Sequence, residues 1–268
     1  MLRVKLSVVC VSLLATVALL TAGCSSTAVD KTATMSPNRI YAEAKEEIAA
    51  SQWERAIPLL EKLEARAAGT PLAQQAQLDK AYAQYKSAET AQALATLERF
   101  MKLHPVSPAM DYAIYLKGVI NFNDDLGLFA KFTRQDLTER DQKASKESFE
   151  AFKELVDRFP DSRYASDAQL RMNYIVSALA QYEVHVARYY YKRGAYLAAV
   201  NRAQVAVSDY REVAAVEEAL YIMYRSYEAL GMTQLRDDAK RVLDKNYPKS
   251  DFMVYGSRAL NDPWWKVW

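Results

Sequence analysis

Residues 81–107, AYAQYKSAETAQALATLERFMKLHPVS, contain the spacing that decides the fold. Ala81 and Ala93 are 12 residues apart, and Pro105 follows Ala93 after another 12. Small residues at this separation let two paired helices approach closely. Proline ends the second helix because it lacks the N–H that would continue the backbone hydrogen bonding. The segment therefore predicts a pair of antiparallel helices followed by a turn.

The same pattern recurs along the chain. Ala44 and Ala56, and likewise Ala187 and Ala199, are also 12 residues apart. Turns of the form aromatic-Pro-x-Ser, in which Ser caps the next helix, occur at 104–107, 159–162 and 247–250, and residues 210–213 stand where a fourth is expected. Only seven Gly occur in 268 residues, which favours helix over turn-rich folds. We expect an all-α solenoid of about five tetratricopeptide-like helix pairs, wound as a right-handed superhelix.

Three positions depart from a regular repeat. In the third unit Gly118 is expected to pair with Ser148, which leaves a long insertion at residues 119–143. In the fifth unit, residues 224–248, Arg236 occupies the small position. Pro58 is compatible with a helix only if that helix begins near Trp53 or Glu54, because proline is tolerated close to a helix start.

The N-terminus predicts a secreted, lipidated chain. Arg3 and Lys5 precede an apolar run at residues 6–20, which is too short for a membrane span, and Ala22-Gly23 lead into Cys24. We interpret residues 1–23 as a cleaved signal peptide and Cys24 as the lipidated residue, which would carry a diacylglycerol and an N-acyl chain. Cleavage by the ordinary signal peptidase, which would leave a free thiol, is the alternative. Ser25 in place of Asp favours the outer membrane, and residues 24–37 form a polar tether.

Removal of the signal peptide leaves 33 basic and 33 acidic side chains. A balanced charge argues against a broad surface for nucleic acid. Cys24 is then the only thiol, so a disulfide framework and a Cys metal site are both excluded.

Sequence motifs for catalysis are absent. The chain has no Gly-rich phosphate loop, no His-Glu-x-x-His and no nucleophile elbow. Structural roles are expected for His104, in a turn, and for His185, in a helix. We therefore expect no enzyme activity, no catalytic residues, no metal site and no cofactor beyond the acyl groups on Cys24. An isolated catalytic Glu in a cleft is the alternative that one sequence leaves open.

Tyrosine is abundant, with 18 residues. Tyr82 and Tyr85, and again Tyr112 and Tyr115, are three residues apart and so share a helix face. Tyrosine supplies a large contact area at low entropic cost, together with a hydroxyl group. These side chains would line a groove suited to an extended peptide. Packing between repeats is the alternative for any single tyrosine.

Residues 183–202, EVHVARYYYKRGAYLAAVNR, interleave basic and aromatic side chains. Because the mature chain is neutral, a protein interface anchored by Arg and Tyr fits better than nucleic acid. Alternatively, the Arg side chains cap helices or pair with Glu183 and Asp209. Residues 262–268, DPWWKVW, hold three of the four Trp. They could fold back on the last repeat, enter a membrane interface or dock on a partner.

Several longer strings stand out along the chain. They are NRIY at 38–41, MDYAIY at 110–115, FPDSRY at 159–164 with DA at 167–168, YE at 182–183, YY at 189–190, RGAY at 193–196 and NR at 201–202. Together they resemble the BamD (ComL) family of outer-membrane assembly lipoproteins. The strings occur in the family's order, and the resemblance covers nearly all of the mature chain.

The resemblance implies a non-enzymatic scaffold of the outer-membrane β-barrel assembly (BAM) complex, on the periplasmic face of the outer membrane. The N-terminal repeats, residues 38–143, would receive unfolded outer-membrane proteins through a C-terminal signal strand. The C-terminal repeats, residues 144–256, would bind BamA, and residues 257–268 form a Trp-rich tail. The matched positions are Tyr41, Tyr82, Tyr85, Tyr112 and Tyr115 for the groove, and Arg193, Asn201 and Arg202 for BamA. Other BAM lipoproteins are implied as partners, and nucleic acid is not.

Another tetratricopeptide lipoprotein, such as a secretin pilotin or a division-site scaffold, is the alternative function. Such proteins share the repeat architecture but lack the long insertion in the third unit and the Arg193-Gly194-Ala195 string.

Overall fold

The computed structural model describes residues 32–122, 139–257 and Leu260. All regular secondary structure in these ranges is helical. The helices are α2 (Pro37–Ala49), α3 (Trp53–Arg66), α4 (Pro71–Lys86), α5 (Thr90–Leu103), α6 (Met110–Asn121), α8 (Glu139–Arg158), α9 (Ala165–Lys192), α10 (Tyr196–Asp209), α11 (Ala215–Ala229), α12 (Thr233–Asn246) and α13 (Asp251–Tyr255).

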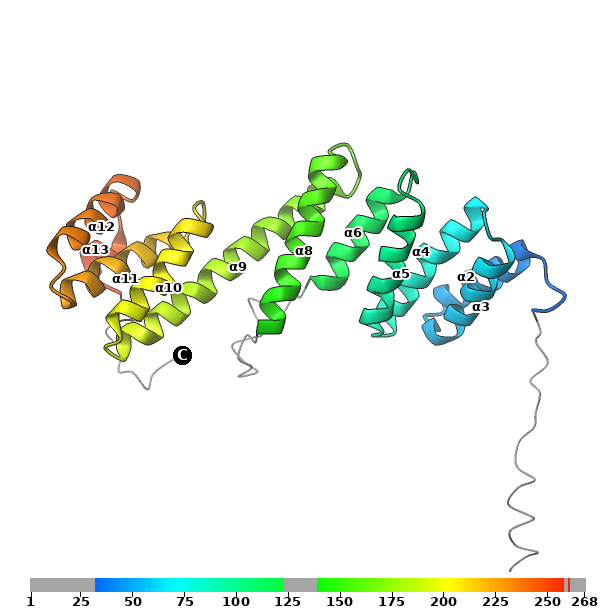
Figure 1. The fold of residues 1–268 in the computed structure, drawn as a ribbon, viewed down its shortest axis with the longest axis horizontal. Helices are drawn as coiled ribbons and strands as arrows, with labels where there is room; N and C mark the ends of the chain where they lie inside the picture. The colour runs from blue at the N-terminus through cyan, green and yellow to red at the C-terminus, as the bar shows by residue number, and fades with distance from the viewer. Residues whose placement is uncertain (1–31, 123–138, 258–259, 261–268) are drawn as a thin grey trace, which may run out of the picture.

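The helices pack as consecutive pairs, α2 with α3, α4 with α5, α6 with α8, α9 with α10, and α11 with α12. Figure 1 shows these pairs side by side along the long axis of the molecule, with α2 and α3 at one end and α12 at the other. The expected solenoid of about five tetratricopeptide-like pairs is confirmed.

The starts of the first helices follow from local sequence. Ser36 and Thr70 accept a hydrogen bond from the third residue of α2 and α4, respectively, and proline follows each cap. Proline suits this position because the first N–H groups of a helix have no partner within the helix. α3 begins at Trp53, so Pro58 lies near its start, as the sequence required.

Small residues form the contacts between helices. Ala44 with Ala56, Ala81 with Ala93, and Ala187 with Ala199 are all fully buried. Larger side chains, among them Leu63, Phe100 and Phe152, fill the spaces between these close approaches. The apolar core therefore runs along the solenoid as a chain of clusters and not as one central mass.

The third pair confirms the expected match of Gly118 with Ser148. The Ser148 hydroxyl donates to the Gly118 carbonyl at 2.8 Å. A Cβ on Gly118 would lie 2.5 Å from the ring of Phe152, so only glycine fits here. The insertion is shorter than expected, because α6 continues through Asn121 and α8 already begins at Glu139. Val119 and Ile120 continue the apolar spacing of α6 into the start of the expected 119–143 segment, whereas α8 begins within its end on the polar run at 139–143.

α9 is the longest of the described helices, with 28 residues. Its N-terminal half packs against α8 through Ala168 and Ile175, while its C-terminal half pairs with α10 through Val184 and Ala187. A single helix is thus shared by the third and fourth pairs, as its diagonal course in Figure 1 shows.

The chain beyond α12 folds back on the last pairs. The Phe252 ring on α13 stacks on Tyr221 of α11, with centroids 5.8 Å apart. The Ser257 hydroxyl donates to Glu218 at 3.5 Å, and Leu260 packs against the clusters formed by α9, α10 and α11. Within the described ranges, every helix is too short or too polar to cross a lipid bilayer.

Candidate functional site

An open pocket of about 370 Å³ lies between α4 and α6. We call it the α4–α6 pocket. Residues of the turn before α6 and of the turn before α9 also line it, so three successive helix pairs contribute to it. Its lining residues are Gln75, Leu78, Asp79, Pro108, Ala109, Asp111, Tyr112, Arg163 and Tyr164.

Three tyrosines form the aromatic side of the pocket. The ring of Tyr164 stacks on Tyr115 with centroids 4.6 Å apart and lies 5.6 Å from the ring of Tyr112. Arg163 lies over the ring of Tyr164 at 4.9 Å. Burial and, as a smaller cause, the negative charge of Asp79 raise the pKa of Tyr112 well above its usual value. The phenol group of Tyr112 therefore stays neutral and can donate a hydrogen bond at physiological pH.

Carboxylates lie beside these rings, and each is held by donors. Tyr115 donates to Asp167 at 2.7 Å, and the Arg171 guanidinium donates to the same carboxylate at 2.6 Å. Burial raises the pKa of Asp167, but these two hydrogen bonds and the charge of Arg171 outweigh burial, so the pKa is lowered. The carboxylate is therefore ionised at neutral pH.

Asp79 connects the pocket to the first repeat. It accepts hydrogen bonds from Tyr41 at 3.0 Å and from Gln75 at 3.1 Å, and Lys45 lies 3.5 Å away. Burial, with the charge and hydrogen bond of Asp79, raises the pKa of Tyr41 to about 12. A row of phenols and carboxylates thus runs from α2 across α4 and α6 to the start of α9.

The structure brings four of the five predicted groove tyrosines into or beside this row. Tyr112 lines the pocket, Tyr115 adjoins it, and Tyr41 joins it through Asp79. Tyr82 contacts Trp53 edge to face at 5.8 Å and lies close enough to Tyr112 to raise the pKa of that phenol. Tyr85 packs against the core of the second repeat, as the packing alternative expected.

The predicted partner surface lies at the turn between α9 and α10. Gly194 has φ +74°, a left-handed conformation that glycine adopts without strain. This conformation lets the N–H groups of Arg193, Gly194 and Ala195 bond to carbonyls of the last turn of α9, and the chain reverses into α10. Arg193 lies over the ring of Tyr189 at 5.3 Å. The Arg-Gly-Ala string is thus a helix stop that presents an arginine.

Arg202 and Asn201 lie on the exposed side of α10. Arg202 also pairs with Glu183 of α9 at 3.3 Å, as the pairing alternative predicted. Glu183 is buried, whereas the Arg202 side chain is 46% exposed. Arg188 forms a two-point hydrogen bond with Glu218 of α11 at 2.9 Å for each contact. Arg202 and Arg188 therefore pair with different glutamates, and the Arg188 pair joins α9 to α11.

Comparison with known proteins decides the family. The model of the YfiO family, described as an outer membrane lipoprotein, matches residues 33–243. A Neisseria meningitidis protein named outer membrane protein assembly factor BamD is 48% identical over 233 residues, which are 87% of this chain and 87% of that protein.

The chain belongs to the BamD family.

More distant members of the family support this. BamD of Vibrio cholerae is 35% identical over 84% of this chain and 92% of its own length, and BamD of Haemophilus influenzae is 33% identical over 87% and 89%. The BamD resemblance inferred from the sequence is confirmed, in preference to a secretin pilotin or a division-site scaffold.

Sequence reasoning did not assign several pocket residues of this BamD family member, chiefly Asp79, Asp111, Arg163 and Tyr164. A signal for Tyr164 was present, because it follows the 159–162 turn and so precedes the next first helix. No such signal marked Asp79, whose partner Tyr41 is 38 residues away.

Metal ligands are not grouped in the part of the chain that the structure describes: no three His, Cys, Asp or Glu side chains lie close enough together to hold an ion. The predicted lipidation site Cys24, most of the predicted 24–37 tether and Trp264, Trp265 and Trp268 lie outside the described residues.

Proposed function

We propose that this chain is a non-enzymatic scaffold of the outer-membrane β-barrel assembly complex. It receives unfolded outer-membrane proteins in the N-terminal repeats and binds BamA through the C-terminal repeats. Membership of the BamD family, whose curated members are named outer membrane protein assembly factors, supports this role. The observation that carries the substrate-receiving part is the α4–α6 pocket, an open surface of tyrosine rings and oriented carboxylates.

The pocket suits an extended peptide. Tyr112 and Tyr164 offer aromatic surface to apolar or aromatic side chains. Asp79 and Asp111 offer carboxylate oxygens, which accept hydrogen bonds from backbone N–H groups of a strand that has no neighbour yet. An unfolded barrel strand has both features: alternate apolar side chains and unpaired backbone donors.

No covalent chemistry is required for this role. Closing strands into a barrel and burying their apolar face in lipid supply the free energy of insertion. The scaffold contributes position, since holding a substrate and BamA on one molecule raises their effective concentration. The acyl groups on Cys24 and the 24–37 tether would keep both at the periplasmic face of the outer membrane.

The second surface, at Arg193, Asn201 and Arg202, is proposed to bind BamA. Arginine and tyrosine are the residue types that most often dominate protein interfaces, and Arg193 with Tyr189 forms such a pair on an exposed turn. This surface lies on α10 and at the turn between α9 and α10, whereas the α4–α6 pocket is lined by α4, α6 and the turns before α6 and α9. The two partners would therefore bind at the same time.

Binding of a dye-labelled peptide that copies the C-terminal strand of an outer-membrane β-barrel protein tests the pocket. Tyr164→Leu keeps apolar volume but removes a ring face and a hydroxyl, and we expect at least fivefold weaker binding by fluorescence anisotropy. Tyr255→Leu is the matched control, because Tyr255 is 79% exposed on α13. Equal affinity for both variants, or equal binding of a shuffled peptide, would place the substrate elsewhere.

The BamA surface needs a variant that leaves the fold intact. Arg202→Glu would place a second carboxylate beside buried Glu183, so it would disturb packing as well as the surface. The double variant Arg202→Gln with Glu183→Gln removes the exposed charge and leaves no unpaired ion. We expect it, and Asn201→Glu separately, to lower BamA recovery in a detergent pulldown from outer membranes, with Tyr255→Leu as control. Unchanged recovery would reject this surface.

A further inference from the structure

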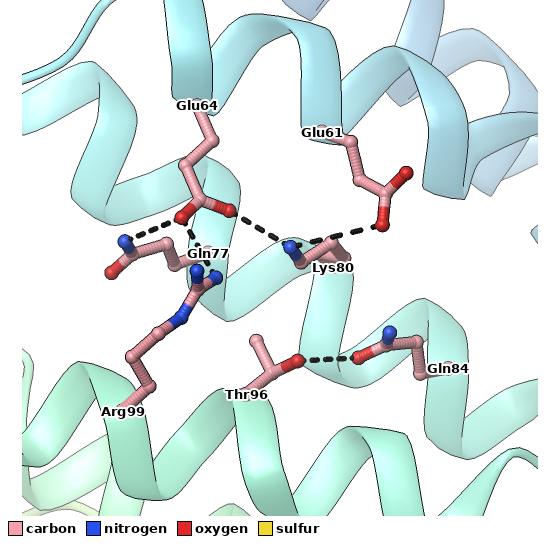
Figure 2. A network of polar contacts seen from close by, with 7 residues as sticks. All are labelled: Glu61, Glu64, Gln77, Lys80, Gln84, Thr96 and Arg99. Carbon is pink, nitrogen blue, oxygen red and sulfur yellow. Dashed lines mark hydrogen bonds and ion pairs between the residues drawn. The ribbon is translucent and has the colours of Figure 1, made fainter.

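A polar network lies behind the pocket, on the opposite side of α4. Figure 2 shows Glu64 reaching from α3 toward side chains of α4 and α5. Its carboxylate accepts from Lys80 at 2.8 Å and from Gln77 at 2.9 Å, and Arg99 lies 2.7 Å away. Beside it, Thr96 donates to Gln84 at 2.8 Å. One glutamate thus ties together three helices from two repeats.

The members on α4 are almost fully buried. Gln77, Lys80 and Gln84 are each 6% exposed, and Thr96 of α5 is 7% exposed. Burying an ammonium group is costly, and an ion pair in such a place seldom adds stability over apolar residues of the same volume. A buried pair is better explained by what it specifies, which is a single arrangement of the elements that carry it.

α4 needs such a device because its apolar faces are lined by small residues. On the side toward the first repeat it presents Ala73, Ala76 and Ala83, and on the other side Leu78 and Ala81. Alanine side chains interlock weakly, so they allow close packing but define the rotation of the helix about its axis poorly. Leu72, Tyr82 and Tyr85 add larger, partly buried contacts, and the buried ion pair adds a directional one.

The network and the pocket lie on opposite faces of this helix. At 100° per residue, the Gln77, Lys80 and Gln84 stripe is about 165° from the stripe formed by Gln75, Asp79 and Tyr82. The second stripe supplies two lining residues of the α4–α6 pocket, Gln75 and Asp79, and the edge contact with Trp53. Fixing one stripe therefore fixes the other.

We propose that Lys80 is a positioning residue: through Glu64 and Arg99 it fixes the rotation of α4 and so holds Asp79 and Gln75 in the α4–α6 pocket. This inference rests on the proposed function of that pocket and adds a group that never touches the bound peptide. A rotation of α4 would turn Asp79 away from Tyr41, and Tyr82 away from Trp53.

The test replaces the ion pair by apolar residues of similar size, Glu64→Leu with Lys80→Met, in the full chain. Because both charges are removed, no buried ion is left unpaired, but the buried Gln77 amide loses its acceptor. We therefore expect a folded chain with a melting temperature a few degrees below that of the wild type. The labelled strand peptide should nevertheless bind at least fivefold more weakly. Lys153→Met with Asp157→Leu is the matched control, an exposed ion pair on α8 at 2.6 Å.

Tryptophan emission reports the rotation directly. In a background of Trp264→Phe, Trp265→Phe and Trp268→Phe, Trp53 is the only indole. Its contacts with Tyr82 at 5.8 Å and Lys86 at 6.0 Å both come from α4. We expect the apolar pair to shift the Trp53 emission and the α8 control to leave it unchanged.

Peptide affinity within twofold of the wild type, or unshifted Trp53 emission in a folded apolar variant, would overturn the positioning role. If that variant fails to fold, the variant Gln84→Leu with Thr96→Val tests the proposal instead, because it removes both partners of the neutral hydrogen bond. We expect it to bind the peptide at least twofold more weakly. Unchanged binding would overturn the proposal. If the wild type itself does not bind the peptide, the proposed function fails, and the Trp53 emission alone decides the rotation of α4.

Discussion

In the N-terminal half, α4 and α6 leave a pocket open between them, whereas in the C-terminal half the chain's own segment covers α11. Phe252 stacks on Tyr221, and Leu260 packs on the neighbouring cluster. α4, α6 and α11 are each the first helix of their pair, and each carries tyrosine. An exposed ring can serve a foreign segment, while a ring covered by Phe252 serves packing.

The two halves also differ in how many helices their buried ionic contacts connect. Glu64 holds donors from two other helices, α4 and α5. In the C-terminal half Glu183 and Glu218 each hold one arginine, Arg202 and Arg188, respectively. The half with the open pocket has the more connected support behind it. This is what a binding surface requires if its groups are to be in place before the ligand arrives.

The largest expected effect comes from removing one partner of the ion pair between Glu64 and Lys80. Lys80→Ala leaves the Glu64 carboxylate without its ammonium partner, and we expect a loss of about 3 kcal/mol in the free energy of unfolding. Urea denaturation measures it. Lys153→Ala, on an exposed ion pair of α8, should leave the transition unchanged. Similar losses for the two variants would show that the network is no more than a surface contact.

A smaller effect is expected from uncovering α11. Phe252→Ala removes the ring stacked on Tyr221, and because Phe252 is only half-buried we expect a loss of about 1–2 kcal/mol. Hydrogen exchange should rise in α13 and α11 and stay unchanged in α4. Faster exchange throughout the chain would mean that the two halves do not differ in local stability.

The turn at the partner surface should be less sensitive. Gly194→Ala forces a Cβ into the left-handed conformation at φ +74°, with no neighbour within 4 Å to clash with, so we expect a loss of about 1 kcal/mol from backbone strain alone. Thermal unfolding measures it. A loss several times larger would indicate a contact at this turn beyond the strain of the backbone.

Acid should weaken the two halves in different pH ranges. Partial burial, then the charges of Arg188 and Lys192, lower the pKa of His185 despite Glu218 nearby. The unfolded state therefore binds the proton more readily, and stability falls as pH drops below about 6.5. His185→Gln should remove this first loss in pH-dependent denaturation; an unaltered profile would contradict it.

The N-terminal half should respond only at lower pH. Burial raises the pKa of Glu64, but hydrogen bonds from Lys80 and Gln77 and the charges of Lys80 and Arg99 outweigh burial and lower it. Its contribution is complete above the unfolded value of 4.5 and is lost as pH falls through the lowered pKa. A Glu64→Gln chain should lose less stability in that range than the wild type.

The repeat architecture could be predicted from the sequence because each pair repeats the same local rule. Ala81 and Ala93 with Pro105 identified one unit, and the rule located Gly118 opposite Ser148 across an insertion. Periodicity places a side chain on a helix face. It does not identify the partner on the next helix, so the bonds of Tyr41 to Asp79 and of Tyr115 to Asp167 could not be predicted.

The extent of α9 was also beyond the sequence pattern. No glycine or proline interrupts residues 165–192, and the apolar spacing continues from one pair into the next. A repeat pattern that expects a turn after every helix does not predict a helix that packs in two successive pairs. The insertion before α8 was overestimated at both ends. Val119 and Ile120 continue the apolar spacing of α6, whereas the polar run at 139–143 has no apolar pattern that would mark the start of α8.

α9 begins just after Tyr164 in the α4–α6 pocket and ends just before Arg193 at the proposed BamA surface. At 1.5 Å per residue its 28 residues make a helix of about 42 Å, so the α4–α6 pocket and the proposed BamA surface lie at opposite ends of one helix. A tilt of about 10° at one end would carry the other end through roughly 7 Å by the same geometry. Under the proposed function, a partner that binds at Arg193 and tilts α9 would therefore displace Tyr164 in the α4–α6 pocket.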